Sequence, residues 1–202
     1  RKHDIRSILS ESFEWKNEIF AFFIEHILCS FFDLKEIVDH YGNLPHDLIT
    51  MKSLSNLEFA FNFIKSRLTK EDFLEFIKVK NHEDANFLHL NEPISSESIS
   101  FALNFVKSAL TTNELRELLC DGDKNNMMPI HCLIQHANVE NIELCLSIYT
   151  EIFTINEIKS FLTQNRESTP LDYNVLHLAA KNPNANSLKF VLELVKRQCS
   201  AD

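Results

Sequence analysis

Apolar residues recur along most of the chain at the three- and four-residue spacing of helices that bury one face. The clearest long runs cover 57–68, 99–110, 142–153 and 188–197, and the first three are each followed by a shorter run with the same spacing. Because this spacing gathers apolar side chains on one side of a helix, the runs predict packed amphipathic helices. Two Gly and five Pro are few, which favours helices over a sheet with many tight turns. We therefore predict an all-α fold.

A polar signal marks the start of each short run. Ser or Thr is followed three residues later by Asp or Glu at Ser30, Thr69, Thr111 and Thr154, in steps of 39, 42 and 43 residues. In this capping box, the hydroxyl oxygen and the acid accept hydrogen bonds from free amides at a helix start. Glu reaches the backbone better than Asp, so we expect the stronger caps at Thr111 and Thr154. The pattern predicts short helices over 73–77, 115–119 and 158–162.

Two further landmarks keep nearly the same step. An eight-residue run beginning at Phe59 returns at Phe101, 42 residues later. Histidines recur near the start of another predicted short helix in each unit, 43, 42 and 46 residues apart, at His46, His89, His131 and His177. Landmarks in register indicate an internal repeat. We predict one elongated repeat domain over 1–202, with an N-terminal partial unit at 1–42 and repeat units at 43–85, 86–127, 128–173 and 174–202.

Composition narrows the class of function. The formal net charge of −9 argues against general binding of nucleic acid or of anionic membranes, since both require clustered Lys and Arg. The most apolar run, Ile19–Phe32, is shorter than the roughly 20 residues of a membrane span and predicts a buried helix. Scattered cysteines indicate reduced, buried thiols in an intracellular protein, most simply a cytoplasmic one. They are Cys29, Cys120, Cys132, Cys145 and Cys199.

The four regularly spaced histidines suggest a metal site at first sight. Equivalent residues in stacked helical units lie about 8–10 Å apart, whereas zinc needs its nitrogen ligands about 2 Å from the ion. One histidine per unit therefore cannot share a metal with its neighbours, and we expect each imidazole to bond the backbone of the adjacent loop and tie units together. His131 and Cys132 are neighbours on a helix and point about 100° apart, so they do not form a catalytic pair. We expect no enzyme activity, no metal and no cofactor.

Two segments carry a resemblance to a known family. Asp123–His131 resembles the ankyrin-repeat consensus D-x-x-G-x-T-P-L-H, which leads from a hairpin loop into a first helix. Asn174–Ala180 is similar to the next part of that consensus, T-P-L-H-x-A-A, and 186–193 is similar to the start of the second ankyrin helix. The resemblance implies an ankyrin-like α-solenoid of about four units with an N-terminal partial unit.

The units depart from this family in length and in the hairpin. An ankyrin unit has about 33 residues, and the short capping-box helix accounts for the longer step here. The consensus Gly of the hairpin is replaced by Asp84, Asn126 and Asp172, residue types that tolerate the left-handed backbone better than other residues with a side chain. In the second unit, Pro93 is expected to shorten the first helix. A HEAT- or armadillo-like array, with units of about 40–47 residues, is the alternative architecture.

The resemblance implies a protein-interaction scaffold whose partner is another polypeptide. In ankyrin proteins the contacts come from the hairpin tips and from the exposed end of the first helix, so we expect the matching positions to bind the partner. On the hairpin tips these positions are His82, Glu83, Ala85, Lys124, Asn125, Met127 and Tyr173. On the first helices they are Gln135, His136, Lys181 and Asn182.

An alternative interpretation keeps the array but gives it another role. The chain starts at Arg1 rather than Met, so it is expected to be a segment of a longer protein. In that case the array recruits a target for an enzyme, or for an effector delivered into a host cytosol, with catalysis outside this chain. A third interpretation is a purely structural segment that packs on another part of its own chain.

Overall fold

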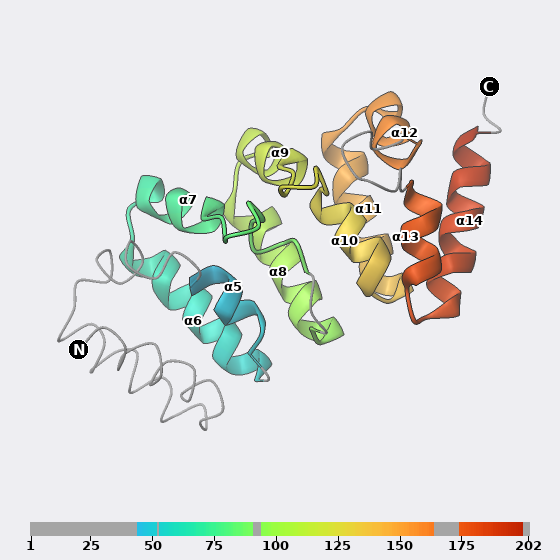
Figure 1. Ribbon diagram of the computed structural model, residues 1–202. Coiled ribbons are helices and arrows are strands. Elements are labelled where there is room, and N and C mark those ends of the chain that lie inside the picture. Colours follow the sequence, from blue (N-terminus) through green and yellow to red (C-terminus); the bar gives the residue numbers. More distant parts are fainter. Residues whose placement is uncertain (1–43, 52, 91–93, 164–173, 200–202) are drawn as a thin grey trace. The chain divides into compact units, whose positions relative to one another are not determined.

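The computed structural model describes residues 44–51, 53–90, 94–163 and 174–199, which form helices and no strand (Figure 1). The predicted all-α fold is therefore confirmed for these residues. The N-terminal partial unit, including the cap expected at Ser30, lies outside them. The helices are α5 (Leu44–Ile49), α6 (Leu54–Arg67), α7 (Lys70–Lys78), α8 (Ser96–Ala109), α9 (Thr112–Cys120), α10 (Pro129–His136), α11 (Val139–Ile152), α12 (Ile155–Thr163), α13 (Val175–Lys181) and α14 (Ala185–Cys199).

Packing divides the chain into two compact units, 1–82 and 83–202. The described part of the first contains α5, α6 and α7. Its core forms where the apolar face of α6 meets α7: the rings of Phe61 and Phe76 lie edge to face with their centroids 6.0 Å apart. Phe73 packs beside Phe76, at a ring separation of 6.2 Å. The three- and four-residue apolar spacing thus brings the two helices together as the sequence predicts.

The second compact unit contains α8 to α14, and its long helices pack in chain order. Helix α11 packs on α8 on one side and on α14 on the other, while α10 packs on α13 (Figure 1). Within this unit, each long helix therefore contacts its counterpart in the neighbouring repeat, and the short helix α12 lies against both α11 and α14.

The long helices begin earlier than the apolar pattern predicted. Starts were expected at 57, 99 and 142, but the helices begin at Leu54, Ser96 and Val139. The cause is a polar cap in front of each: Ser53, Ser95 and Asn138 accept a hydrogen bond from the amide three residues later. The first turn after each cap is mostly polar, so apolar spacing alone does not identify it as part of the helix.

The predicted capping boxes are present at Thr111 and Thr154. The Glu114 carboxylate accepts a hydrogen bond from the Thr111 amide at 2.7 Å, and the Glu114 amide donates to the Thr111 hydroxyl at 3.4 Å. The corresponding distances for Thr154 and Glu157 are 2.8 Å and 3.3 Å. At Thr69, the hydroxyl accepts from the Asp72 amide at 3.1 Å and donates to the shorter Asp72 carboxylate at 2.7 Å.

One predicted helix is wrong. A short helix was expected to open at the second histidine motif, but 86–90 form only a turn, closed by a hydrogen bond of 2.9 Å from the His89 amide to the Asn86 carbonyl. Pro93 explains the difference, because proline has no amide hydrogen and disfavours helical backbone at the residue before it. The turn is nevertheless well packed, since every side chain from Ala85 to Leu90 is buried.

A partly buried polar network, centred on the buried Asn141, joins the long helices α8 and α11. The Asn141 amide group donates to the Ser96 hydroxyl at 3.0 Å and to the Ser96 carbonyl at 3.3 Å, and its oxygen accepts from the Ser100 hydroxyl at 2.8 Å. Asn138 adds a bond of 3.0 Å to the Ser96 hydroxyl. Since buried polar groups are costly unless they are paired, this network fixes how the two helices align.

Candidate binding surface

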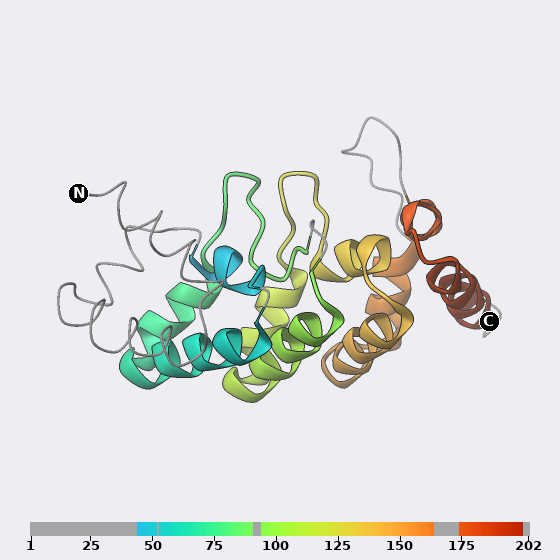
Figure 2. The ribbon, with the colours of Figure 1, turned by 90° about the horizontal axis from the view of Figure 1, so that it is seen from below.

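The loop between α9 and α10 forms a hairpin (Figure 2), and hydrogen bonds join residues within its tip. The Asp123 amide donates to the Met127 carbonyl at 3.0 Å, and the Asn126 amide donates to the Asp123 carbonyl at 2.8 Å. The Asp123 carboxylate turns inward and accepts from the amides of Asn125 and Met127 at 2.8 and 2.7 Å. Four hydrogen bonds therefore hold the backbone of the tip in place.

The hairpins use left-handed backbone where the sequence predicted it. Asp84 and Asn126 both have a φ of 57°. Only residues that tolerate this region can turn the chain there, and Asp and Asn do so at lower cost than other residues with a side chain. The prediction is confirmed at both positions, while Asp172 lies outside the described residues.

Replacing Asn126 tests this conformation. We expect Asn126→Val to lower the free energy of unfolding by about 1–3 kcal/mol, because a β-branched residue is strained at positive φ. Asn126→Gly is the matched control and should leave stability within about 0.5 kcal/mol of the parent, since glycine has no Cβ to clash. Urea unfolding followed by circular dichroism measures both. Equal stability of the two variants would contradict the left-handed turn.

Successive hairpins are tied to each other within the second compact unit. The Lys124 amide donates to the Glu83 carbonyl at 2.9 Å, and the two side chains form an ion pair. Beneath the tip, His89 Nε2 lies 2.7 Å from the Met127 carbonyl oxygen. The segment that begins at Glu83 and the 121–128 loop are thus bonded at the tip and at the base, which restricts their relative movement.

The described histidine bonds lie within single predicted repeat units, where the sequence predicted bonds between units: His89 bonds to Met127 and His131 to Phe161. His131 Nδ1 accepts a hydrogen bond of 3.1 Å from the Met128 amide, so the ring proton sits on Nε2 and is donated to the Phe161 carbonyl at 2.8 Å. His177 is exposed, and its Nδ1 accepts from the Asn174 amide at 3.3 Å. His46 lies half-buried in α5. Within the described ranges, no three His, Cys, Asp or Glu side chains are grouped as metal ligands would be.

His89 sits in a more enclosed setting than His177. Its Nδ1 lies 3.2 Å from the Asn86 carbonyl oxygen and 3.1 Å from the Asn86 side-chain oxygen. Burial lowers the pKa of His89, and the neighbouring carbonyls of Met127 and Asn86 offset part of this effect. The imidazole is therefore largely neutral at pH 7 and acts as a bonded packing group between two segments of the chain.

The cysteines differ partly from the prediction of buried thiols. Cys132 and Cys145 are buried, but Cys120 is exposed at the end of α9. Partial burial raises the pKa of Cys120, and burial raises that of Cys145 far more. Neither thiol is therefore activated as a nucleophile at neutral pH, because the thiolate is the reactive form. The side chains of Cys29 and Cys199 lie outside what the structure describes.

Most residues expected to bind a partner are accessible, and two are not. Ala85 is 0% exposed because the chain turns inward after the left-handed Asp84. Asn182 is 7% exposed, and its amide group donates to the carbonyls of Ile134 and Ala137 at 2.9 and 2.8 Å. Both are structural residues, so the expectation that they are surface contacts is corrected. Tyr173 lies outside the described residues.

The remaining expected contacts have side chains at the surface. The exposed ones are His82, Lys124, Asn125, His136 and Lys181. The partly exposed ones are Glu83, Met127 and Gln135. Lys124, Asn125 and Met127 come from the hairpin before α10, and Gln135 and His136 from the end of that helix. This hairpin and the helix that follows it therefore supply most of the accessible candidate residues in the second compact unit.

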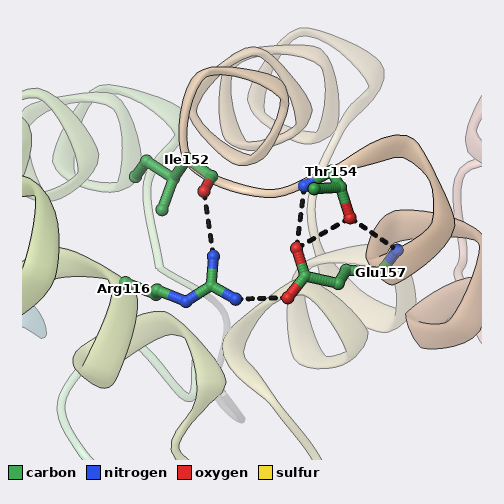
Figure 3. A network of polar contacts seen from close by, with 4 residues as sticks. All are labelled: Arg116, Ile152, Thr154 and Glu157. Atoms are coloured by element: carbon green, nitrogen blue, oxygen red, sulfur yellow. Dashed lines mark hydrogen bonds and ion pairs between the residues drawn. The ribbon is translucent and has the colours of Figure 1, made fainter.

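Sequence reasoning missed a second set of contacts, centred on Arg116 (Figure 3). Arg116 Nη1 donates to the Ile152 carbonyl at 3.0 Å, and Nη2 pairs with the Glu157 carboxylate. The guanidinium carbon lies 4.6 Å from the centre of the Phe153 ring, within the range of a cation–π interaction. Since the partners lie 36 to 41 residues away, no local pattern marks Arg116 as a link between repeats.

The Arg116–Glu157 contact predicts a dependence of stability on pH. The pKa of Glu157 is lowered by hydrogen bonds from the Thr154 backbone and hydroxyl, and further by Arg116. Its stabilising contribution is therefore present above the unfolded-state pKa of about 4.3 and is lost as pH falls through the lower folded-state value. We expect the melting temperature of Glu157→Gln to fall less than that of the parent between about pH 5 and pH 3. Parallel melting profiles would contradict this role.

The comparisons with known proteins return no match. No protein-family model matches the chain, and neither does a curated protein or a solved structure. Within the described residues, no helix combines the length and apolar character needed to cross a membrane.

Proposed function

We propose that the chain is an ankyrin-like α-solenoid that binds a polypeptide partner through its hairpin tips and the exposed end of α10. The observation that carries this proposal is the tip at 123–127. Its backbone is held by four hydrogen bonds, while the side chains of Lys124 and Asn125 are exposed. A fixed backbone that displays polar side chains loses little conformational entropy on binding, which is the advantage of a preorganised surface.

The ankyrin-like arrangement is favoured over a HEAT- or armadillo-like array by the loops. In the two described repeats with a hairpin, a left-handed residue closes the turn and a histidine bonds to a later segment of the chain. The resemblance in sequence covers the same residues, from Asp123 to His131. The added short helices α9 and α12 accompany this unit without altering the hairpin.

The proposed mechanism is non-covalent binding, with no reaction catalysed by this surface. The ion pair between Lys124 and Glu83 is exposed to solvent, so it contributes little to stability and can exchange one partner for a charged group of a bound peptide. His136 and Gln135 extend the accessible surface from the tip along α10. A partner lying across the tip and this helix end would meet both charged and uncharged polar groups.

Selection of peptides on the intact chain tests the proposal. A random peptide library displayed on phage is panned against the immobilised protein, and the affinities of selected synthetic peptides are then measured by fluorescence polarisation. We expect Lys124→Ala, Asn125→Ala and His136→Ala together to weaken binding by about tenfold or more, as loss of one or more contact residues does. The control is Glu140→Ala with Glu143→Ala, two exposed positions on α11.

The outcomes separate clearly. Weaker binding by the triple variant, with unchanged binding by the control pair, supports the placement of the site. Equal affinity of the triple variant and the parent would show that the peptides bind elsewhere. A library that yields no saturable binder would count against the function itself.

A further inference from the structure

One apolar face of α14 is not buried, whereas the equivalent faces of α6, α8 and α11 are buried. The four long helices can be compared position by position, counting from the polar residue that caps each one: Ser53, Ser95, Asn138 or Asn184. Counted in this way, each helix carries three apolar residues at equivalent positions. In α6, α8 and α11 all nine of these side chains are buried: Leu57, Phe61, Ile64, Ile99, Leu103, Val106, Ile142, Leu146 and Tyr149. In α14 the equivalent residues are Leu188, Leu192 and Val195, and none of them is buried.

The central position of this triplet shows the difference most clearly. Leu103 is 1% exposed and Leu146 is 9% exposed, but Leu192 is 38% exposed. The same residue type at the same place in the repeat is thus covered twice and uncovered once. Leu192 is one of two large hydrophobic side chains that are exposed among the described residues, the other being Ile155.

The covered faces show what kind of element provides the cover. In the first compact unit, Phe61 of α6 meets Phe76 of the following short helix, with ring centroids 6.0 Å apart. In the second, Tyr149 of α11 meets Phe161 of the following short helix, also at 6.0 Å. Each covering helix begins at a Thr whose hydroxyl accepts a hydrogen bond from the amide three residues later, and each carries apolar residues at positions i, i+3 and i+4. These stripes are 73, 76 and 77 in α7, and 158, 161 and 162 in α12.

Charge adds a second requirement for the occupant. The last turn of α6 carries Lys65 and Arg67, and the first turn of its covering helix α7 carries two acids. Helix α14 likewise ends with two exposed cations, Lys196 and Arg197. A covering helix with acidic residues in its first turn would place opposite charges together, and it would also suit the positive end of its own helix dipole.

We propose that the outer face of α14 docks a short amphipathic helix of a partner polypeptide, with apolar residues at i, i+3 and i+4 and acids in its first turn. This helix takes the place that α7 and α12 hold on the earlier long helices, so the docking face continues an interface that the chain already builds. The face is separate from the hairpin tips, and the proposal does not depend on the proposed function. The two surfaces can therefore be tested separately.

A peptide cut from the chain itself is the probe. A synthetic peptide of residues 153–163 contains the capping box and the stripe of α12. It is titrated into the intact ¹⁵N-labelled protein to about 1 mM, because a free helix of this length is marginal in water and pays to order itself on binding. We expect saturable shifts of the amides around Leu188, Leu192 and Val195.

Two controls make the test specific. Leu192→Asp should abolish the shifts without unfolding the chain, since Leu192 is already partly exposed, whereas Leu192→Met should keep them. Ile155→Asp changes the other exposed large hydrophobic residue, which is 53% exposed, and should have no effect. A peptide with Ser at its Phe161 and Leu162 positions should not bind.

Three results would overturn the proposal. The first is the absence of any shift at the highest peptide concentration. The second is binding that persists in Leu192→Asp, which would place the site elsewhere. The third is self-association of the chain that Leu192→Asp removes, measured by sedimentation equilibrium, because the occupant would then be a second copy.

Discussion

Replacing Tyr149 with alanine should lower the free energy of unfolding by about 3–5 kcal/mol, the usual cost of removing a large aromatic ring from a core. The ring is fully buried in α11 and packs against Phe153 and Phe161, at centroid distances of 5.0 and 6.0 Å. Its hydroxyl donates to the Leu119 carbonyl at 2.8 Å, which links α11 to the preceding short helix. Burial raises the pKa of Tyr149, so the hydroxyl keeps its proton and remains a donor.

The variant Tyr149→Phe is the control for this prediction. It keeps the ring and removes only the hydroxyl, leaving the Leu119 carbonyl without this donor, so we expect a loss of about 1–2 kcal/mol. Urea unfolding followed by far-ultraviolet circular dichroism compares the two variants with the parent. If Tyr149→Ala were no less stable than Tyr149→Phe, the aromatic cluster would contribute nothing to stability beyond the Tyr149 hydroxyl.

The variant His131→Ala should lose about 2–4 kcal/mol, because it leaves two backbone groups without their partner in a buried setting. The Met128 amide would lose the acceptor Nδ1, and the Phe161 carbonyl would lose the donor Nε2. One of these bonds closes the start of α10, and the other joins that helix to α12 in the same repeat. We expect His131→Gln to recover part of the loss, since its side-chain amide can replace one of the two bonds.

The matched control for His131 is the same change at His177. This imidazole is exposed, and the Asn174 side chain still accepts hydrogen bonds from the amides of Leu176 and His177 in α13. We expect His177→Ala to cost less than about 1 kcal/mol. Similar losses at the two positions, measured in the same urea titrations, would show that the bonds of His131 contribute nothing beyond a helix cap.

Much of the local structure followed from the sequence because local chemistry decides it. Thr111 and Thr154 start helices through bonds to Glu residues three positions away, and a three-residue pattern carries that information. Asp84 and Asn126 adopt left-handed backbone because few other residue types tolerate it. Apolar spacing likewise revealed the long helices, although not their polar first turns.

Contacts between repeats were harder to foresee, because their partners lie more than thirty residues apart. Arg116 is an ordinary charged helical residue until α11 and α12 bring Ile152, Phe153 and Glu157 beside it. Asn182 occupies an expected surface position in sequence, yet the carbonyls of Ile134 and Ala137 draw its side chain inward. The sequence therefore identified loops and helix ends that are accessible, but not which of their side chains turn inward.

We propose that hairpin-tip side chains bind a partner, while His131 joins α10 to α12 within its own repeat. The most direct measurement determines both peptide affinity and melting temperature for Lys124→Ala with Asn125→Ala, and for His131→Ala. We predict that the tip variant loses affinity with little change in melting temperature, and that the histidine variant has a lower melting temperature. Below that temperature, His131→Ala should bind the peptide as the parent does. Unchanged affinity in the tip variant would contradict the claim.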